Sequence, residues 1–349
     1  MSKNITSEYY NLNELMSRHY TINMICGTRN AGKSTAVQKY CIKRAINFYN
    51  QNKSGSQFAM IVRYDNNTSL MCKTYFDNTM EQFYPDYEIE YFRKQFYLKH
   101  KKQNKKIVVG YPFALNKASE YKSSSYPHIN TILFEEFLNI KNKHICNKEQ
   151  PELEVELLLS IWSTIARGAG KKIRDDVKCL LVANCYYINN PFFRYFKFID
   201  DIVKNPFNRF YVKGNKPRCL LEITHQNLEL NFTRDGMTSG TNFVDMQNEL
   251  KIINKPVVND ILFQLTLDNK EYINVARYND GIIVFSNKNK IRNNVMVFSC
   301  SEIKKKGIYN IKTFKTLTQY KILLEQFNNN WLYYDSLQTY IYLYDILAF

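Results

Sequence analysis

The sequence Gly27-Thr28-Arg29-Asn30-Ala31-Gly32-Lys33-Ser34 comes directly after the apolar run Ile22–Cys26. It matches G-x-x-x-x-G-K-[ST], a phosphate-binding loop whose glycines let successive backbone N–H groups point at phosphate oxygens. The pattern predicts a strand over the apolar run and a helix over Ser34–Asn50, at whose N-terminus anions bind favourably. We expect Lys33 to reach the β- and γ-phosphates of ATP and Ser34 to offer its hydroxyl to Mg²⁺. The alternative is a glycine-containing turn before a helix.

A pair of acidic residues, Glu135 and Glu136, follows the short apolar strand predicted over Asn130–Phe134. Parallel strands point their carboxyl ends at the ligand crevice, so the pair is expected beside the phosphate loop. There Glu135 would hold the Mg²⁺ shell and Glu136 would polarise the attacking water. A solvated loop start is the alternative for the acid pair alone. Together, the two motifs indicate an ATPase and favour hydrolysis over phosphoryl transfer to a metabolite.

A third strand with a polar tip is predicted after a helix. The helix covers Pro151–Ala166, with apolar residues at helical spacing, and ends at Arg167 before a glycine-containing segment. The strand covers Val177–Ala183 and has Asn184 at its tip. This order suits the additional-strand class of P-loop ATPases, in which the polar tip senses the γ-phosphate. A strand-end Asn that starts a turn is the alternative.

The segment between the phosphate loop and the acid pair alternates strand and helix patterns, with a strand over Phe58–Tyr64 and a helical stretch over Thr68–Phe83. Two antiparallel strands, Glu88–Leu98 and Ile107–Leu115, are predicted next, joined by the basic turn Lys99–Lys106. This turn is either a DNA-contacting loop or a solvated tip. The first part of the chain therefore has the organisation of a mostly parallel α/β sheet.

The chain has 349 residues, a hydrophobic content of 45% and a formal net charge of +16. This length indicates two domains, and the basic balance indicates a polyanionic partner, above all nucleic acid. A drift toward amino acids of A/T-rich codons is the alternative source of the charge. The eight cysteines include no C-x-x-C pair, which excludes a zinc ribbon or a disulfide framework. With no membrane-length apolar stretch and no signal-peptide profile, a cytosolic protein is expected.

The pattern weakens over Lys213–Asn254, where Gly and Pro interrupt short polar stretches and predict a linker. The elements predicted beyond it are strands over Ile261–Leu267, Tyr272–Tyr278, Gly281–Phe285 and Val295–Ser299, then helices over Phe314–Asn328 and Ser336–Leu347. This order resembles an RNase H-like core. The prediction is thus an α/β P-loop ATPase domain over residues 1–212, a linker over 213–254 and a small α+β domain over 255–349.

Three motifs, G-T-R-N-A-G-K-S, Y-P-H-I-N-T-I-L-F-E-E-F and A-N-C-Y-Y-I-N-N-P-F-F, in this order, resemble those of the packaging ATPases of small protein-primed tailed phages, the Picovirinae and relatives of phi-29. The resemblance is densest over Ile22–Phe193 and extends to Trp331–Leu347. It implies a homopentameric ring that translocates double-stranded DNA into the prohead by ATP hydrolysis, attached to the portal through a structural RNA. It also implies a place in the cytoplasm of the infected bacterium, docked on the prohead and not in the mature virion.

The resemblance also assigns site residues. It makes Lys33, Ser34 and the rest of the phosphate loop through Thr35 the contacts to ATP and Mg²⁺. Glu135 becomes the metal-shell acid, where the family commonly has Asp, and Glu136 becomes the catalytic glutamate. Arg167 matches the arginine that the family inserts into the neighbouring subunit's site.

Further cations are assigned by the same resemblance. Arg174 is the second candidate for the inserted arginine, because the spacing from Arg167 to the Asn184 strand looks longer than in the family. Arg29 matches a basic loop residue that orients a phosphate or relays contacts from a neighbour. Lys122 matches a lysine that acts across the subunit interface. Arg63 and Lys73 are predicted to face DNA.

The C-terminal domain raises the question of a nuclease, which needs three or four carboxylates on two metals. The available acids are Asp268, Asp280, Asp335 and Asp345. The resembling phages package a unit-length genome and need no cutting, so we expect a vestigial nuclease fold that binds RNA, DNA or the portal. The alternatives for the whole chain are a terminase-like ATPase with an active nuclease, a nucleotide-regulated nucleic-acid-binding protein, and a small-molecule kinase.

Overall fold

A computed structural model describes most of the chain, in two compact units, Met1–Asn242 and Phe243–Phe349. The described residues are 10–27, 31–138, 144–146, 150–167, 173–184, 190–205, 208–214, 217–224, 251–253, 258, 260–267, 271–279, 281–288, 295–301, 307–328 and 332–348. Within this described part, no helix is both long and apolar enough to span a lipid bilayer. Each unit has its own sheet and its own apolar core.

The first unit is built on a large, mostly parallel sheet with the order β3-β4-β5-β2-β6-β7-β1-β9-β8. Its strands are β1 (Ile22–Gly27), β2 (Gln57–Val62), β3 (Tyr87–Phe92), β4 (Gln95–His100), β5 (Lys106–Ala114), β6 (Ile129–Glu135), β7 (Lys178–Asn184), β8 (Phe210–Lys213) and β9 (Cys219–Thr224). The strand after the acid pair, β7, lies between β1 and β6 and is parallel to both. The predicted strand with a polar tip is therefore confirmed as a neighbour of the carboxylate strand, and the structure shows that it also lies beside the phosphate-loop strand.

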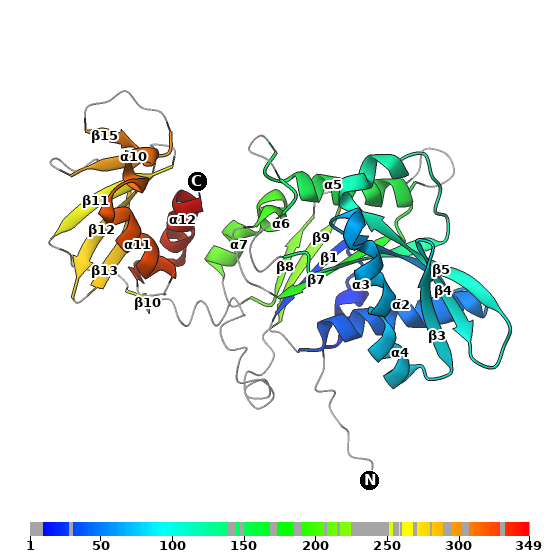
Figure 1. The fold of residues 1–349 in the computed structure, drawn as a ribbon. Helices are drawn as coiled ribbons and strands as arrows, with labels where there is room; N and C mark the ends of the chain where they lie inside the picture. Colours follow the sequence, from blue (N-terminus) through cyan, green and yellow to red (C-terminus); the bar gives the residue numbers. More distant parts are fainter. Residues whose placement is uncertain are drawn as a thin grey trace, which may run out of the picture. The chain divides into compact units, whose positions relative to one another are not determined.

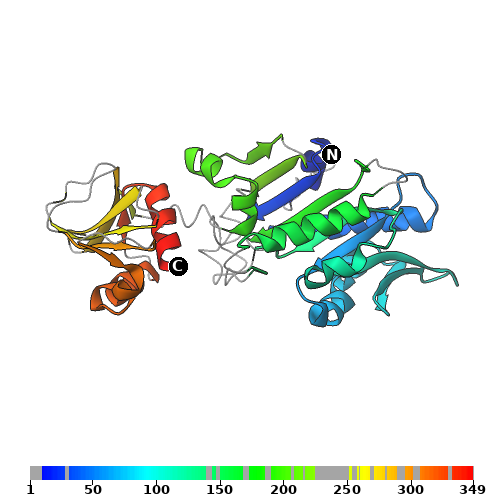
Figure 2. The ribbon, with the colours of Figure 1, turned by 90° about the horizontal axis from the view of Figure 1, so that it is seen from above.

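Helices cover both faces of this sheet (Figures 1 and 2). The helices on one face are α1 (Leu12–Ser17), α2 (Lys33–Tyr49), α3 (Thr68–Thr74) and α4 (Asp77–Phe83), and those on the other are α5 (Leu153–Ile165) and α6 (Pro191–Tyr195). Short 3-10 helices follow β2 (η1, Asp65–Asn67) and β5 (η2, Leu115–Tyr121), and α7 (Ile199–Lys204) precedes β8. Buried residues of α2, among them Val37 and Ile42, pack on β-strand residues in one apolar core. This packing fixes the phosphate-loop helix against the middle of the sheet.

Two predicted elements of the first unit are each divided in the structure. The strand predicted over Glu88–Leu98 is a hairpin, in which β3 and β4 pair antiparallel with Phe92 opposite Gln95. The helix predicted over Thr68–Phe83 is α3 and α4, interrupted at Tyr75 and Phe76. Phe76 is buried in aromatic contacts with Phe58 and Phe96. Long-range contacts of this kind leave no local sequence signal.

The predicted linker begins too early. Residues Cys219–Thr224 form β9, which is buried along its whole length and pairs in parallel with β1. Burial of a strand beside the phosphate-loop strand overrides the Gly and Pro residues that surround it. The rest of the predicted linker lies largely outside the described residues, from 225 to 250.

The second unit contains a mixed sheet with the order β10-β16-β13-β12-β11-β14-β15. Its elements are β10 (Lys251–Ile252), β11 (Ile261–Thr266), β12 (Glu271–Tyr278), β13 (Gly281–Lys288), β14 (Val297–Ser299), β15 (Ile308–Asn310), α10 (Ile311–Lys315), α11 (Thr318–Asn328), β16 (Tyr333–Tyr334) and α12 (Leu337–Ala348). The predicted meander β11-β12-β13 is confirmed, and β14 adds to it parallel to β11. Apolar residues of the sheet and of the three helices form one core.

The β3–β4 turn allows a test of the fold. Arg93 and Lys94 have φ of 49° and 58°, the left-handed values that a two-residue type I′ turn requires and that Asn-Gly adopts best. Replacing the pair by Asn-Gly should therefore raise the free energy of unfolding by about 1 kcal/mol. The lost surface ion pair from Lys94 to Asp65 (2.9 Å) contributes little.

The measurement is the urea midpoint of the full chain. Lys99→Gly is the matched control, because Lys99 is exposed in the extended strand β4 and glycine there should cost about 0.5–1 kcal/mol. A lower midpoint for the Asn-Gly variant would contradict the assigned turn.

Candidate nucleotide site

The phosphate loop begins where β1 ends, in the middle of the sheet. Gly27 pairs in register with Asn184 of β7 and Thr224 of β9. A Cβ at Gly27 would lie 1.9 Å from Thr224 Oγ1, so a larger residue would have to displace the Thr224 side chain. Gly32 precedes α2 with φ of 80°, a left-handed value that favours glycine. Residues 28–30, with Arg29, lie outside the described residues.

Lys33 and Asn184 meet at the carboxyl edge of the sheet. The Lys33 ammonium donates to the Gly27 carbonyl at 3.2 Å and to Asn184 Oδ1 at 3.4 Å. Lys33 is only 5% exposed, and a buried cation needs such oxygen acceptors. The structure thus brings together two residues that lie 151 positions apart in the sequence. The sensing role of Asn184 stays a prediction.

Glu135, the last residue of β6, lies beside the first turn of α2. Its carboxylate accepts hydrogen bonds from Ser34 Oγ and, at 2.7 Å, from the Tyr75 hydroxyl. Burial raises the pKa of Glu135, although the two hydrogen bonds and the charge of Lys33 act in the opposite direction. A carboxylate and a hydroxyl oxygen at one point are ligands that Mg²⁺ prefers. The pair therefore fits the predicted metal position, and Tyr75 is a neighbour that its local sequence does not mark.

Glu136 is exposed and follows β6 with a left-handed φ of 52°. Arg63, just after β2, donates to the Glu136 carbonyl at 2.9 Å and to the Phe137 carbonyl at 2.7 Å. The Arg63 side chain is 13% exposed and forms an ion pair with fully buried Glu154. This geometry does not support the predicted contact of Arg63 with DNA, because its guanidinium is used within the chain. Lys73, the other predicted DNA-facing cation, is exposed on α3.

Arg167 and Arg174 lie at the other edge of the sheet, where β6 begins. Exposed Arg167 donates to the Lys122 carbonyl at 3.2 Å. The acceptors of Arg174 are the carbonyls of Tyr126, Pro127 and Ile129 and the carboxylate of Asp176. These contacts hold Arg174 within its own chain. The geometry therefore favours Arg167 as the arginine that a neighbouring chain can meet.

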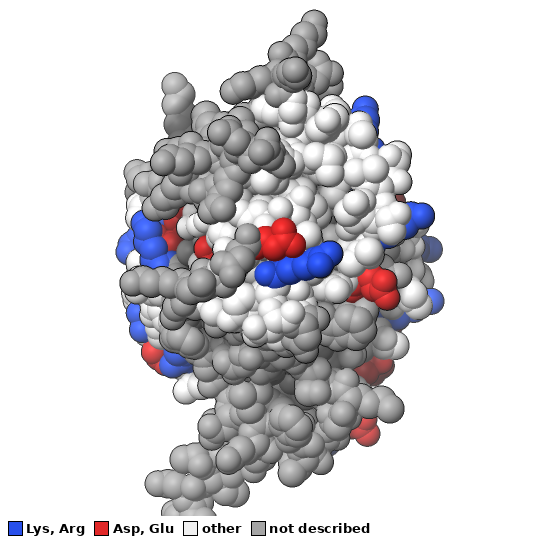
Figure 3. All heavy atoms as spheres, turned by 90° about the vertical axis from the view of Figure 1, so that its left-hand side faces the viewer, with Lys and Arg blue, Asp and Glu red and all other residues white. Residues whose placement is uncertain are grey.

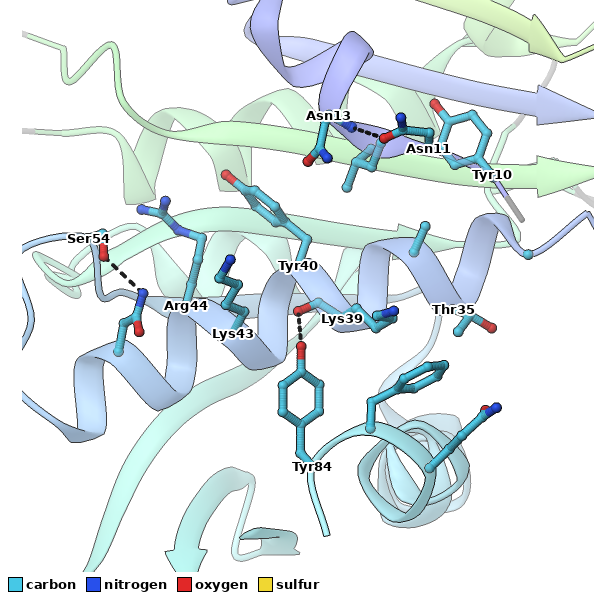
Figure 4. Close-up of a pocket in the computed structure, with 16 residues that line it drawn as sticks. Tyr10, Asn11, Asn13, Thr35, Lys39, Tyr40, Lys43, Arg44, Ser54 and Tyr84 are labelled. Atoms are coloured by element: carbon cyan, nitrogen blue, oxygen red, sulfur yellow. Dashed lines mark hydrogen bonds between the residues drawn. The ribbon is translucent and has the colours of Figure 1, made fainter. Parts of the chain in front are cut away.

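An open groove of about 940 Å³ runs along α2 from the phosphate loop (Figure 4). Figure 4 shows Lys39, Tyr40, Lys43 and Arg44 of α2 between the segment of Tyr10 and Asn11 on one side and Tyr84 on the other. Gly32 and Thr35 line its phosphate-loop end. All its charged lining residues that the structure describes are cationic, so the groove favours an anionic or polar ligand.

The net positive charge of the chain is not spread evenly over its surface. On the face drawn in Figure 3, Lys and Arg side chains lie interspersed with Asp and Glu among the described residues. The groove along α2 is therefore a better-defined cationic feature than this face.

The fold and the site define a class of protein. A parallel sheet that brings a phosphate-loop lysine, an acid pair and a polar strand tip to one carboxyl edge is the arrangement of P-loop nucleotide-binding proteins. Residues 4–347 match the family described as podovirus DNA encapsidation protein (Gp16). This match spans nearly the whole chain, and the chain belongs to that family. The resemblance to phage packaging proteins seen in the sequence is confirmed.

Individual relatives agree with the family. The chain is 29% identical over 251 residues to the DNA packaging protein of Bacillus phage phi29, covering 71% of this chain and 67% of that protein. It is 30% identical over 196 residues to the DNA packaging protein of Bacillus phage B103, covering 56% of this chain and 54% of that protein. A solved chain of the bacteriophage Phi-29 viral genome packaging motor assembly has a similar fold, with a TM-score of 0.56, 21% identity and coverage of 98% of this chain and 100% of that chain.

Removing the charge of Glu135 should stabilise the nucleotide-free protein, because burial makes this charge unfavourable. Because the pKa of Glu135 is raised, the folded state binds the Glu135 proton more tightly than the unfolded state does. Ionisation of Glu135 therefore destabilises the fold as the pH rises above the ordinary pKa of Glu. Glu135→Gln should raise the free energy of unfolding of the nucleotide-free protein at neutral pH by about 1 kcal/mol. The difference from wild type should shrink below about pH 4.5.

Urea unfolding at several pH values measures this difference. Glu136→Gln is the matched control, because Glu136 is exposed and its charge carries no burial cost. A Glu135→Gln protein that is less stable than wild type at neutral pH would contradict the assignment of Glu135 as a costly buried charge.

Proposed function

We propose that the chain is the ATPase of a phage DNA-packaging motor. It binds ATP with Mg²⁺, hydrolyses it, and, as a homopentameric ring docked on the prohead, translocates double-stranded DNA. The observation that carries the proposal is the convergence of Lys33, Glu135 and Asn184 on one carboxyl edge, in a member of the DNA encapsidation family. The structural RNA, the portal and the cytoplasm of the infected host belong to the same proposal. An additional-strand P-loop domain is the fold it requires.

The roles at the site follow from the contacts. The triphosphate would lie in the phosphate loop, where Lys33 would exchange its Gly27 and Asn184 acceptors for phosphate oxygens. Ser34 and Glu135 would hold Mg²⁺, which offsets charge on the β- and γ-phosphates when bound. Glu136 would orient the attacking water and take its proton, and Asn184, released from Lys33, would contact the γ-phosphate.

The nucleoside of ATP would occupy the groove along α2. The groove starts at Gly32 and Thr35, next to the phosphate loop. Half-buried Tyr84 offers aromatic surface to a base from one side, and buried Tyr10 closes the other side. The backbone N–H of Tyr10 donates to the Ala31 carbonyl at 3.0 Å, which joins this wall directly to the phosphate loop.

Arg167 would complete the site of a neighbouring subunit. It follows α5, whose 13 residues span about 20 Å, from the side of Glu136 to the opposite edge of the sheet. The guanidinium of Arg167 therefore lies too far from the phosphate loop of its own chain to contact a nucleotide there. A ring, in which the edge of one subunit meets the site of the next, would bring the two together, and a guanidinium there offsets charge on the transferring phosphoryl.

The second unit is proposed to be an RNase H-like, vestigial nuclease domain that contacts RNA, DNA or the portal. The antiparallel meander β11-β12-β13, extended by β14 parallel to β11, supports this fold. Of its candidate acids, Asp335 accepts hydrogen bonds from the Ser286 backbone N–H at 2.9 Å and the Thr339 hydroxyl at 2.5 Å. These contacts support a structural role for Asp335. Asp268 and Asp280 lie outside the described residues.

The first test of the proposal is ATP turnover with and without double-stranded DNA over a range of protein concentrations. Wild type should show turnover that DNA stimulates and that rises cooperatively with concentration, because a ring completes each site. Glu136→Gln should lower kcat by about 100-fold or more. Glu120→Gln, an exposed surface change on η2, is the control. Turnover that ignores both DNA and the Glu136→Gln change would favour a nucleotide-regulated binding protein instead.

The role of Arg167 is tested by mixing two inactive proteins. Glu136→Gln and Arg167→Ala subunits should each be inactive alone, but mixed rings contain sites where an intact Glu136 faces an intact Arg167. Turnover should therefore recover to a maximum at intermediate ratios. The same mixture with Arg174→Ala in place of Arg167→Ala separates the two candidates. Absence of recovery at every ratio would show that Arg167 does not act between subunits.

A further inference from the structure

The backbone of Glu136 has a conformation that this residue does not adopt readily. Its φ of 52° lies in the left-handed region, which is sparsely populated by residues other than glycine, Asn and Asp. The direction of the Glu136 carboxylate depends on this backbone, because the side chain leaves from the same Cα. Such a conformation persists only where surrounding contacts enforce it. The contacts around Glu136 therefore decide where its carboxylate points.

Arg63 supplies these contacts from the neighbouring strand. Two of its nitrogens donate to the carbonyls of Glu136 and Phe137, at 2.9 and 2.7 Å. The amide of Phe137 donates to the Val182 carbonyl at 3.3 Å, on β7. The Arg63 guanidinium also lies over the Phe134 ring, 5.1 Å from its centroid. The turn after β6 is thus attached to the strands on both its sides.

Glu154 in turn fixes Arg63. It is fully buried, and its two oxygens each lie 3.1 Å from Arg63 Nε. The same carboxylate contacts His144 Nδ1 at 3.1 Å and accepts from the Ile145 backbone N–H at 2.8 Å. Burial alone would raise the pKa of Glu154, but His144 and Arg63 together lower its pKa below the ordinary value. Glu154 is therefore a charged, fully engaged anchor for the Arg63 fork.

We propose that Arg63 and Glu154 are positioning residues for hydrolysis, which hold Glu136 in its left-handed conformation and so aim its carboxylate at the water. Within the described residues, the hydrogen bonds of these two side chains go to each other, to the turn after β6 and to residues 144 and 145, so the pair should act on kcat and not on nucleotide binding. The inference rests on the proposed ATPase function only through the role of Glu136. The arrangement of the pair around the turn after β6 is independent of that function.

The test uses Arg63→Lys, Glu154→Gln and the double variant in the full chain. Arg63→Lys keeps the charge but loses the two-pronged donor. A small displacement of Glu136 should lower kcat by about 10- to 100-fold, while KM and the affinity for a fluorescent ADP analogue change by less than about threefold. Because the pair acts as a unit, the double variant should lose no more kcat than the worse single variant.

Arg209→Lys is the matched control. Arg209 pairs with Glu222, a second fully buried glutamate, on β9. It should lower the melting temperature as Arg63→Lys does, yet leave kcat unchanged. Equal kcat effects in the two lysine variants, or loss of ADP binding together with kcat, would overturn the proposal, because both results indicate a general role in stability.

Hydrogen exchange of a peptide covering residues 134–138 separates this proposal from the proposed function. Exchange there should be faster in Arg63→Lys and Glu154→Gln than in wild type and Arg209→Lys. If wild type shows no ATP turnover, the motor function is overturned, and the exchange result alone decides the positioning role. Unchanged exchange in all variants would overturn the positioning role even in an active enzyme.

Discussion

A nearly buried cation at the centre of the sheet is the constraint on which the rest of the site depends. The Lys33 ammonium needs oxygen partners, and the structure provides them from the end of β1 and from Asn184 at the tip of β7. This is possible only because β7 lies between β1 and β6 and ends level with both. The same register places Glu135 at the first turn of α2. The order of the strands therefore sets the electrostatics of the site.

The two acids at the end of β6 are treated very differently by the fold. Glu135 is enclosed, and its partners are hydroxyls from α2 and from the end of α3, where Tyr75 interrupts the helix. Glu136 is exposed, but its backbone is the constrained part. Glu135 thus lowers the stability of the fold through the burial of its charge, and Glu136 lowers it through its left-handed backbone. Adjacent costs of this kind are characteristic of functional sites, where stability is exchanged for placement.

The sequence predicted well those features that local patterns encode. The strand and the helix that flank the phosphate-loop motif, the acid pair at the end of β6 and the meander of the second unit all follow from spacing within short windows. The β3–β4 turn was missed because Arg93 and Lys94 are not residues that mark a type I′ turn. The break before α4 and the strand β9 were missed because distant packing partners decide them. Arg63 was predicted to face DNA because a cation after a strand carries no sign that Glu154, 91 residues later, will engage it.

The helix α5 explains why one long-range pair matters to the whole unit. Glu154 lies in its first turn and holds Arg63, which contacts the turn that carries Glu136, whereas Arg167 follows its last turn at the opposite edge of the sheet. A helix with a buried apolar face is stiff over this length, because each turn packs on the sheet beneath it. The two ends of α5 therefore cannot shift independently. The helix thus connects the edge that carries exposed Arg167 with the Glu154–Arg63 pair that contacts the turn of Glu136.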